Sequence, residues 1–366
     1  MARVLLVEPF LGGSHEAWAS GWMDHSRHTI VRLGHEGRHW RWRMRGGAVT
    51  MARALEQQTA EIGAVDAVVA SNMLDLAGFL GLTRRSLGDA RVVQYFHENQ
   101  LSYPRQPGEA LDAGLAWMQW RGAAAADELW WNSAFHRDAF FAGLDDLLAT
   151  VPDHGHGPER KAVATRCWVA PPGIQLDALR SGDRVDGARP LIVSNQRWHH
   201  DKDVGAVVRA VRRLVEAGLD VELAVVGDSA GGEAALIDPL LDELGERVVA
   251  RGMLERAAYV ELLQRADVVV SAARGENFGI AVVEAIAAGA WPVLPRALSY
   301  PEIVPAAFHA DCLYDDGGLG RRLAATVEAV AAGTHAPAGL ADAMAVHAWP
   351  SAAARLDDRI DRLLGV

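Results

Sequence analysis

The two glutamates at positions 276 and 284 have the spacing that points most directly to chemistry in this chain. They bound the segment Glu276–Glu284, which follows the apolar run Val268–Ser271, and a helix is expected to begin near Gly279. Glycine lets a backbone approach a ligand closely, and unpaired N–H groups at a helix start attract phosphate. Glu284 would then lie about two turns into the helix, facing the same ligand.

This arrangement predicts a site for a nucleoside diphosphate sugar. One carboxylate can hold ribose hydroxyls and the other a sugar ring, with the diphosphate between them. The intervening residues are therefore candidates for donor binding, namely Asn277, Phe278, Gly279 and Ile280. The alternative interpretation is an acidic helix start with a glutamate on a solvated face.

Two cations, Arg197 and Lys202, lie five residues apart shortly after another apolar run, Leu191–Val193. At a strand end, both side chains can reach a pyrophosphate and neutralise it as a leaving group without a metal ion. Lysine is rare here, since Lys161 and Lys202 are the two lysines among 36 basic residues. A solvated basic loop is the alternative.

A glycine turn at Gly12 and Gly13, followed by Ser14 and His15, comes after the first apolar run, Val4–Val7. Its amides can bind an anion at the start of a helix, although the glycine spacing is not the dinucleotide-binding fingerprint. A plain tight turn is the alternative.

A polar loop, residues 97–104, follows the apolar run Val92–Phe96. Sites in α/β folds are built where strands end, so His97, Glu98 and Asn99 are candidates to contact a sugar and an acceptor hydroxyl. A locally hydrogen-bonded turn is the alternative.

The basic part of the chain is residues 27–53, which contain seven arginines and one acidic residue, Glu36. Within it, Trp40 and Trp42 alternate with Arg41, Arg43 and Arg45. Aromatic rings can stack on bases while arginines bind phosphates, which is typical of RNA recognition. Packing of both rings in the core is the alternative.

The sequence argues against several other kinds of site. The segment His35–His39 has metalloprotease spacing, but Gly34 and Gly37 argue against the helix that such a zinc site requires. The two cysteines, Cys167 and Cys312, exclude a disulfide framework and a cysteine-based zinc module. We find no nucleophile-elbow or Walker motif in the sequence.

Short apolar runs alternate with helical stretches throughout the 366 residues, the pattern of parallel α/β sheets. We expect two doubly wound, Rossmann-like domains, at residues 1–183 and 190–345, joined by the polar and glycine-containing stretch 181–190. Residues 349–366 have apolar positions at helical spacing, and Pro350 suits a helix start. This final helix could pack on either domain.

The composition of the chain excludes one class of function and indicates a cellular compartment. The net charge of −11 (36 basic against 47 acidic residues) excludes a generally polybasic nucleic-acid binder but leaves room for a local basic patch. We expect neither a signal peptide nor a membrane span, and the low cysteine content favours a reducing cytoplasm.

Taken together, these motifs resemble the retaining GT-B glycosyltransferases, in which two Rossmann-like domains face a central cleft and a final helix crosses back to the first domain. A narrower resemblance is to the tRNA-queuosine α-mannosyltransferase family. It is carried by Gly12-Gly13-Ser14-His15, Trp40-x-Trp42-Arg43-x-Arg45, the block Tyr95–Pro104, Asn132-Ser133-x-Phe135, Pro152-Asp153-His154 and Tyr300-Pro301-Glu302.

The resemblance implies transfer of mannose from GDP-mannose to the cyclopentenediol of queuosine at the tRNA wobble position, without cofactor or metal. Arg197 and Lys202 would stabilise the leaving diphosphate, Glu284 would hold the ribose, and Glu276 would hold mannose. His97 would lie near the reacting sugar, and Gly12 and Gly13 near the diphosphate. The expected acceptor residues are Ser14, His15, Trp40, Trp42, Arg43, Arg45, Glu98, Asn99 and Asn132.

Three other functions remain open at this point. The enzyme could use a nucleotide sugar on a small-molecule, nucleoside or glycan acceptor, or it could be a sugar-nucleotide epimerase of the same fold. A non-catalytic RNA- or sugar-nucleotide-binding protein is the alternative from another class. The sequence indicates no membrane association and no obligate protein partner.

Overall fold

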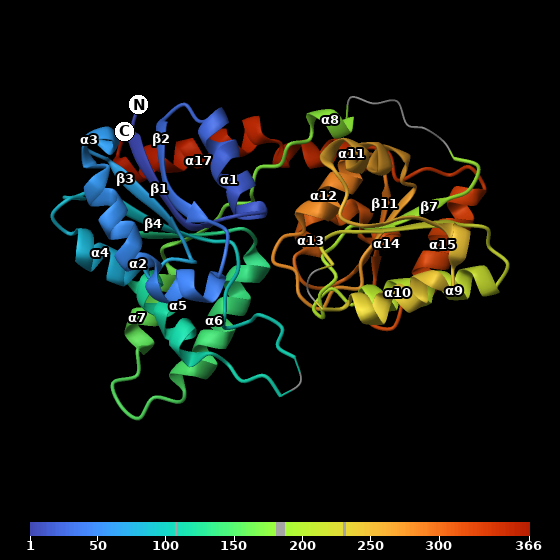
Figure 1. Cartoon of the computed structure of the whole chain (residues 1–366), viewed down its shortest axis with the longest axis horizontal. Coiled ribbons are helices and arrows are strands. Elements are labelled where there is room, and N and C mark those ends of the chain that lie inside the picture. The colour runs from blue at the N-terminus through green and yellow to red at the C-terminus, as the bar shows by residue number, and fades with distance from the viewer. Residues whose placement is uncertain (107, 181–186, 230–231) are drawn as a thin grey trace. The chain divides into compact units, whose positions relative to one another are not determined.

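A computed structural model describes residues 1–106, 108–180, 187–229 and 232–366, which form two compact α/β units (Figure 1). Unit 1 consists of Met1–Ile174 together with Trp349–Val366, and unit 2 of Gln175–Ala348. Of the predicted linker, residues 181–186 lie outside the described part. The division at Ile174 comes earlier than the predicted boundary, since helix α8 (Asp177–Arg180) packs against α11 (Arg256–Arg265) and α12 (Ile280–Ala287) of unit 2.

Unit 1 contains a six-stranded parallel sheet with the strand order β2-β1-β3-β4-β5-β6. The strands are β1 (Arg3–Leu11), β2 (Thr29–Glu36), β3 (Ala67–Ser71), β4 (Arg91–Phe96), β5 (Glu128–Trp131) and β6 (Cys167–Val169). The helices are α1 (Ser14–His25), α2 (Trp40–Gln57), α3 (Thr59–Ile62), α4 (Leu76–Thr83), α5 (Ala113–Ala125), α6 (Ala134–Leu148), α7 (Gly157–Ala164) and α17 (Trp349–Leu364).

Both faces of this sheet are covered, which explains why its strands are apolar without alternation. Successive residues of β1 enter two different hydrophobic clusters. Leu5 and Val7 pack in one cluster, whereas Val4 and Leu6 pack in the other, with Trp22 of α1.

The C-terminal helix α17 packs on unit 1 through the face that its apolar spacing predicts. Trp349, Leu356 and Ile360 are buried in the cluster that contains Val4 and Leu6. The buried carboxylate of Asp357 accepts a hydrogen bond of 2.9 Å from Nε1 of Trp22. Helix α17 is therefore an integral part of unit 1.

Unit 2 also contains a six-stranded parallel sheet, with the order β12-β11-β10-β7-β8-β9. The strands are β7 (Leu191–Ser194), β8 (Glu222–Val226), β9 (Val248–Gly252), β10 (Val268–Val270), β11 (Trp291–Pro295) and β12 (Leu313–Tyr314). The α-helices are α8 (Asp177–Arg180), α9 (Val204–Glu216), α10 (Ala234–Asp242), α11 (Arg256–Arg265), α12 (Ile280–Ala287), α13 (Tyr300–Ile303), α14 (His309–Cys312), α15 (Leu319–Ala331) and α16 (Leu340–Ala343). The described residues of this unit also include the 3₁₀ turns η1 (Gly245–Arg247), η2 (Ala306–Phe308) and η3 (Met344–His347).

Each sheet has a point where the direction of winding reverses. In unit 1 it lies between β1 and β3, and in unit 2 between β7 and β10. Open parallel sheets bind ligands beyond the carboxyl ends of their strands at such points. The fold therefore directs attention to the residues that follow β1, β3, β7 and β10. No helix in the described residues is both long and apolar enough to cross a membrane.

Candidate functional site

Lys202 joins two of the predicted motifs in unit 2. Its side chain is buried, with Nζ 3.1 Å from Oε2 of Glu276 and 3.2 Å from the Asp201 carboxylate. It also donates a hydrogen bond to the carbonyl oxygen of Gly275. The ends of β7 and β10 thus bring together a cation and a carboxylate that are 74 residues apart in the sequence.

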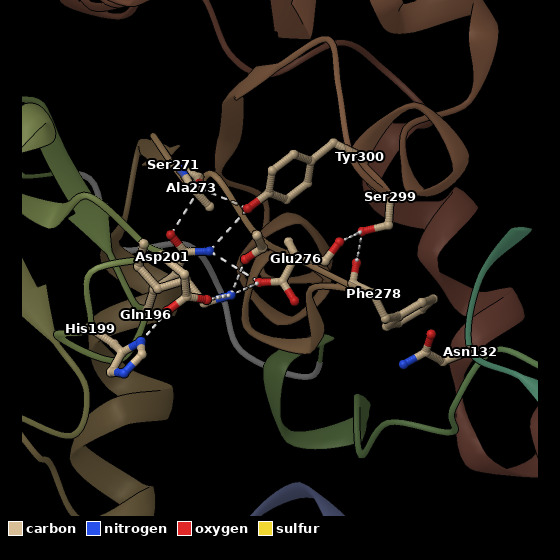
Figure 2. A network of polar contacts seen from close by, with 12 residues as sticks. Asn132, Gln196, His199, Asp201, Ser271, Ala273, Glu276, Phe278, Ser299 and Tyr300 are labelled. Carbon is tan, nitrogen blue, oxygen red and sulfur yellow. Dashed lines mark hydrogen bonds and ion pairs between the residues drawn. The ribbon is translucent and has the colours of Figure 1, made fainter. Parts of the chain in front are cut away.

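Glu276 belongs to a larger hydrogen-bond network (Figure 2). The Gln196 amide donates to Oε2 of Glu276 at 3.3 Å and to the Tyr300 hydroxyl at 3.0 Å, while Ser271 donates to Oε1 of Gln196 at 2.8 Å. Burial, and then the charge of Glu276, raise the pKa of Tyr300 well above its usual value, so this hydroxyl stays protonated. Sequence reasoning did not assign Gln196, Ser271 or Tyr300 to the site.

Asp201 keeps its negative charge although it is buried. Burial alone would raise its pKa, but the charge of Lys202 and the hydrogen bond from His199 outweigh this effect and lower it. Lys202 is consequently held between two carboxylates, Asp201 and Glu276.

The loop before α12 has the conformation that the sequence predicts. Gly279 has a φ of 97°, in the left-handed region that favours glycine, and α12 begins at the next residue. The Ser299 hydroxyl donates to the carbonyl oxygens of Glu276 and Phe278, at 3.2 and 2.9 Å, and so holds this loop. Asn277 and Ile280 are half-buried, and Phe278 is buried.

Glu284 is held by two residues that sequence reasoning missed. Nη1 of Arg256 lies 2.7 Å from one carboxylate oxygen, and the Tyr259 hydroxyl donates to the other at 3.0 Å. Tyr259 in turn accepts a hydrogen bond of 2.9 Å from Asn195. Because Asn195 and Gln196 are neighbours at the end of β7, this strand end connects to both glutamates. Arg197, the next residue, has an exposed side chain.

In unit 1, Glu8 of β1, His15 of α1 and His97, directly after β4, form a cluster in which the first two are buried and His97 is half-buried. Nδ1 of His15 lies 2.9 Å from Oε2 of Glu8, and Nε2 of His97 lies 3.8 Å from the same oxygen. The two imidazole rings are 4.0 Å apart between centroids. Burial, and then charge on His15, hold the pKa of His97 well below its usual value.

The backbone of His97 is fixed from both sides by amide side chains. Asn72, which follows β3, accepts a 3.0 Å hydrogen bond from the N–H of His97, and Asn132 donates to its carbonyl oxygen at 2.9 Å. Asn99 is buried and makes two hydrogen bonds of 2.7 Å with Ser102. Asn99 and Asn132 therefore support the loop, and their contact with an acceptor stays a prediction.

The two glycines of the Gly12–Gly13 turn have different structural roles. A Cβ on Gly12 would lie 3.1 Å from Cα of Gly37, so Gly12 allows two backbone segments to pass closely. Gly13 has a φ of 55°, and a Cβ there would meet nothing within 4 Å. Ser14 is exposed and Glu98 is half-buried. Gly13 and Ser14 consequently offer the accessible part of this turn.

The two tryptophans of α2 also have different environments. Trp40 is half-buried and packs against a methionine-rich cluster with Met44, whereas Trp42 is 61% exposed. Arg45 pairs with Asp112, and Nη2 of Arg41 lies 3.9 Å from a Glu109 oxygen. Trp40 therefore packs in part against the core, Trp42 is available for stacking, and contact of either ring with an acceptor stays a prediction.

The arginines of residues 27–53 do not form one patch. Arg27 pairs with Asp358 and Asp361 of α17. Arg43, in contrast, is half-buried, and its Nε has no hydrogen-bond partner among the described residues. The basic character that remains near Trp42 comes from the first turns of α2.

Two groups of described residues have enough ligand atoms within reach of one metal ion, Glu8-His15-His97 and His199-His200-Asp201. Two imidazoles bound to one tetrahedral zinc ion have ring centroids about 5 Å apart, given zinc–nitrogen bonds of about 2 Å. The observed separations are 4.0 Å and 4.2 Å, with the rings tilted by 36° and 51°, so each pair lies closer together than a shared zinc ion would hold it. His35 lies in β2 and His39 precedes α2, so the zinc helix considered for that segment does not form.

Protein-family models match each of the two units. A family model described as tRNA-queuosine alpha-mannosyltransferase N-terminal matches residues 3–174, and one for glycosyl transferases group 1 matches residues 177–317. A tRNA-queuosine alpha-mannosyltransferase from Drosophila melanogaster is 30% identical over 316 residues, which cover 83% of this chain and 82% of the relative.

More distant similarities concern the general class and the fold. A D-inositol 3-phosphate glycosyltransferase 1 from Catenulispora acidiphila is 29% identical over 61% of this chain and 54% of that protein. The structure of sucrose-phosphate synthase from Thermosynechococcus elongatus matches with a TM-score of 0.74 at 15% identity, covering 99% of both chains. At that identity the likeness shows the fold alone, which is GT-B. The chain is thus a glycosyltransferase and belongs to the tRNA-queuosine alpha-mannosyltransferase family.

Proposed function

We propose that this glycosyltransferase transfers mannose from GDP-mannose to the cyclopentenediol of queuosine at the wobble position of tRNA, with retention of the anomeric configuration. The observation that carries the proposal is the buried Lys202–Glu276 pair at the switch point of unit 2, in a chain of the family named for this reaction. The Drosophila relative carries the name of the same activity.

The donor part of the proposal rests on unit 2. Lys202 and Arg197 would neutralise the diphosphate as the bond from C1 of mannose to its phosphate oxygen breaks. Glu276, held by Lys202 and Gln196, would bind mannose hydroxyls, while Glu284, held by Arg256 and Tyr259, would bind the ribose. These cations would do the work that a metal ion does in other transferases, so we infer transfer without a metal.

The acceptor part rests on unit 1. His97 would contact the reacting sugar, and the exposed Trp42 would stack on a base while arginines at the start of α2 bind phosphates. As the new bond forms from C1 to the acceptor oxygen, the proton of the acceptor hydroxyl would pass to the leaving phosphate. The reaction then needs no separate general base.

The direct test is to incubate the purified protein with GDP-mannose and tRNA from cells with and without queuosine, followed by nucleoside mass spectrometry. We expect one added hexose on queuosine, and none on tRNA that lacks this nucleoside. GDP-glucose, UDP-glucose and ADP-glucose in parallel reactions test the base and the sugar of the donor.

Two other outcomes would contradict parts of the proposal. A hexose adduct with free queuosine nucleoside at the same rate would remove tRNA from the definition of the acceptor. Hydrolysis of GDP-mannose without any adduct on tRNA would keep the donor and overturn the acceptor.

A further inference from the structure

Glu8 is a buried carboxylate that has no permanently charged partner in the part of the chain that the structure describes. Its side chain belongs to β1, is 1% exposed and accepts a 2.9 Å hydrogen bond from the backbone N–H of Phe10. Among the described residues, its ion-pair contacts are with two imidazoles, His15 and His97, and with no lysine or arginine. A buried carboxylate needs compensation of this kind, because transfer from water is costly for a charge.

One carboxylate can balance one imidazolium. His15, at 2.9 Å, is within hydrogen-bond distance of Glu8, whereas His97, at 3.8 Å, is not. Burial and charge on His15 keep the pKa of His97 well below its usual value. The arrangement therefore pairs Glu8 with His15 and leaves His97 neutral.

A neutral imidazole carries its hydrogen on one of two nitrogens, and the structure favours Nε2 of His97. This atom is buried, faces Oε2 of Glu8 and has no hydrogen-bond partner among the described residues. A hydrogen on Nε2 points toward the carboxylate, whereas a lone pair there would face its negative charge. Oε2 still has a lone pair for this contact, since it accepts one hydrogen bond, from His15.

The position of the imidazole ring is otherwise well defined. Asn72 and Asn132 hold the backbone of His97, and the ring packs against Tyr95 and Trp18 at centroid distances of 4.6 and 5.2 Å. The remaining freedom of this side chain is the choice of tautomer. Carboxylates fix the tautomer of catalytic and metal-binding histidines in this way in other proteins.

We propose that Glu8 is a positioning residue that acts through His97, by keeping its hydrogen on Nε2 and leaving the Nδ1 lone pair to accept a hydrogen bond from a sugar hydroxyl. The identity of that hydroxyl group rests on the proposed function, in which His97 contacts the donor sugar. The state of the imidazole does not depend on it.

The first experiment therefore reads the imidazole itself. Side-chain nitrogen NMR spectra of the 15N-histidine-labelled protein, with the His97 signals assigned by His97→Asn, should show a neutral ring with its hydrogen on Nε2 at pH 7. In Glu8→Gln the amide oxygen should keep the hydrogen bond from Phe10 N–H, so that the NH2 group takes the place of Oε2 and donates, and the hydrogen of His97 should move to Nδ1. A wild-type ring that is charged, or that carries its hydrogen on Nδ1, would overturn the proposal even if the variant fails to fold.

The second experiment is a double-mutant cycle on the transfer reaction. Glu8→Gln should lower kcat about 10- to 100-fold with less than about a threefold change in the KM for GDP-mannose. In the His97→Ala background, the same change should alter kcat less than about twofold, because its route of action is already gone. Glu16→Gln, an exposed acidic residue in the first turn of α1, is the matched control.

An equal loss in both backgrounds would show that Glu8 acts on the fold and not through His97. If the wild-type protein transfers no hexose to queuosine, the proposed function fails, whereas the NMR result still decides the tautomer.

Discussion

Each unit has a cluster of ionisable side chains near the carboxyl ends of its strands, and the two clusters differ in the kind of charge that they contain. In unit 2, Lys202 lies between Asp201 and Glu276, so a permanent cation is fixed by two carboxylates. In unit 1, Glu8 has two imidazoles as partners, and His97 packs among the rings of Trp18 and Tyr95. One cluster holds fixed charges, and the other holds groups whose protonation depends on their surroundings.

This difference suggests a division of labour. A cation that is oriented before the ligand arrives stabilises the charge that develops on a leaving group without reorganisation. A neutral imidazole instead distinguishes hydroxyl groups by direction, because it has one donor and one acceptor nitrogen. Unit 2 should therefore dominate the rate of bond breaking, and unit 1 the arrangement of the reacting groups.

The largest effect is expected for Lys202→Met. Loss of the ammonium group should lower kcat about 10³-fold, the upper range for one preorganised donor, while the Kd for tRNA changes less than about threefold. Steady-state transfer assays and tRNA binding measure the two quantities. Lys161→Met removes the only other lysine, which is exposed on α7, and should leave both unchanged.

The proposed division of labour between the units is wrong if Lys202→Met lowers kcat no more than His97→Ala does. It is also wrong if the tRNA affinity of Lys202→Met falls as far as its kcat, because Lys202 would then bind the acceptor. A thermal melt of each variant separates these outcomes from loss of the fold, since Asp201 and Glu276 lose a shared partner.

The second effect concerns acid stability, where the two units should differ. Burial lowers the pKa of His136 in unit 1 to about 3, so below pH 6.5 the unfolded chain binds a proton that the folded chain excludes. Unfolding at pH 5 should be easier by about 2 kcal/mol than at pH 7 from this group alone. Asp201 in unit 2 has a lowered pKa, so its contribution is present above about pH 4 and is lost below it.

Chemical denaturation at pH 7 and pH 5 tests this difference. In His136→Gln the loss of stability between the two pH values should shrink by about 2 kcal/mol, whatever the variant costs at pH 7. Hydrogen exchange followed by mass spectrometry assigns the change to a unit. Acid-induced opening of unit 2 before unit 1 would contradict the prediction.

Much of the fold could be predicted because its signals are local. The run Val4–Val7 lies within β1, and helix α12 begins directly after Gly279, as the glycine and the preceding strand indicate. The strand Leu313–Tyr314 was missed because two residues are too short to show a periodic pattern. The link between Lys202 and Glu276 could be expected, since parallel strands end at the same edge of a sheet.

The site residues that could not be predicted depend on contacts between distant parts of the sequence. Glu8 has the sequence context of an ordinary strand end, and its importance comes from His97, which directly follows another strand, β4. Arg256 and Tyr259 belong to a helix with no motif, and they become relevant because the fold brings them to Glu284. Asn99 bonds to Ser102 of its own loop, a contact that the sequence does not reveal, and its contact with an acceptor stays a prediction.

The third prediction concerns the acceptor and uses the two tryptophans of α2. Trp42→Ala should weaken tRNA binding about tenfold, the loss of about one stacked base, without changing the salt dependence of the Kd. Trp40→Ala should instead lower the melting temperature, since Trp40 packs against Met44 and its neighbours. Filter binding over a range of salt concentrations measures the first effect.

Replacing Arg41, Arg43 and Arg45 together by alanine should flatten the salt dependence that Trp42→Ala leaves intact. The change should be smaller than three phosphate contacts would give, because Arg45 already pairs with Asp112 and Arg41 lies near Glu109. Unchanged tRNA affinity in all of these variants would move the RNA-binding surface away from α2.

The smallest effect is expected for Tyr259→Phe, which tests whether Glu284 binds the donor or acts in bond breaking. The change removes one hydrogen bond to the carboxylate, while Arg256 continues to hold the other oxygen and Asn195 keeps its bond to the carbonyl oxygen of Ala281. A hydrogen bond to a charged group is worth about 1.5–3 kcal/mol, and because Arg256 still holds Glu284 we expect about 1 kcal/mol of this to reach the ligand, so the Kd for GDP should rise about fivefold. Calorimetry with GDP measures this Kd without any acceptor.

If Glu284 binds the ribose equally in the ground and transition states, kcat stays within about twofold. A fall in kcat at unchanged Kd would instead place Glu284 beside Lys202 in the stabilisation of the leaving group.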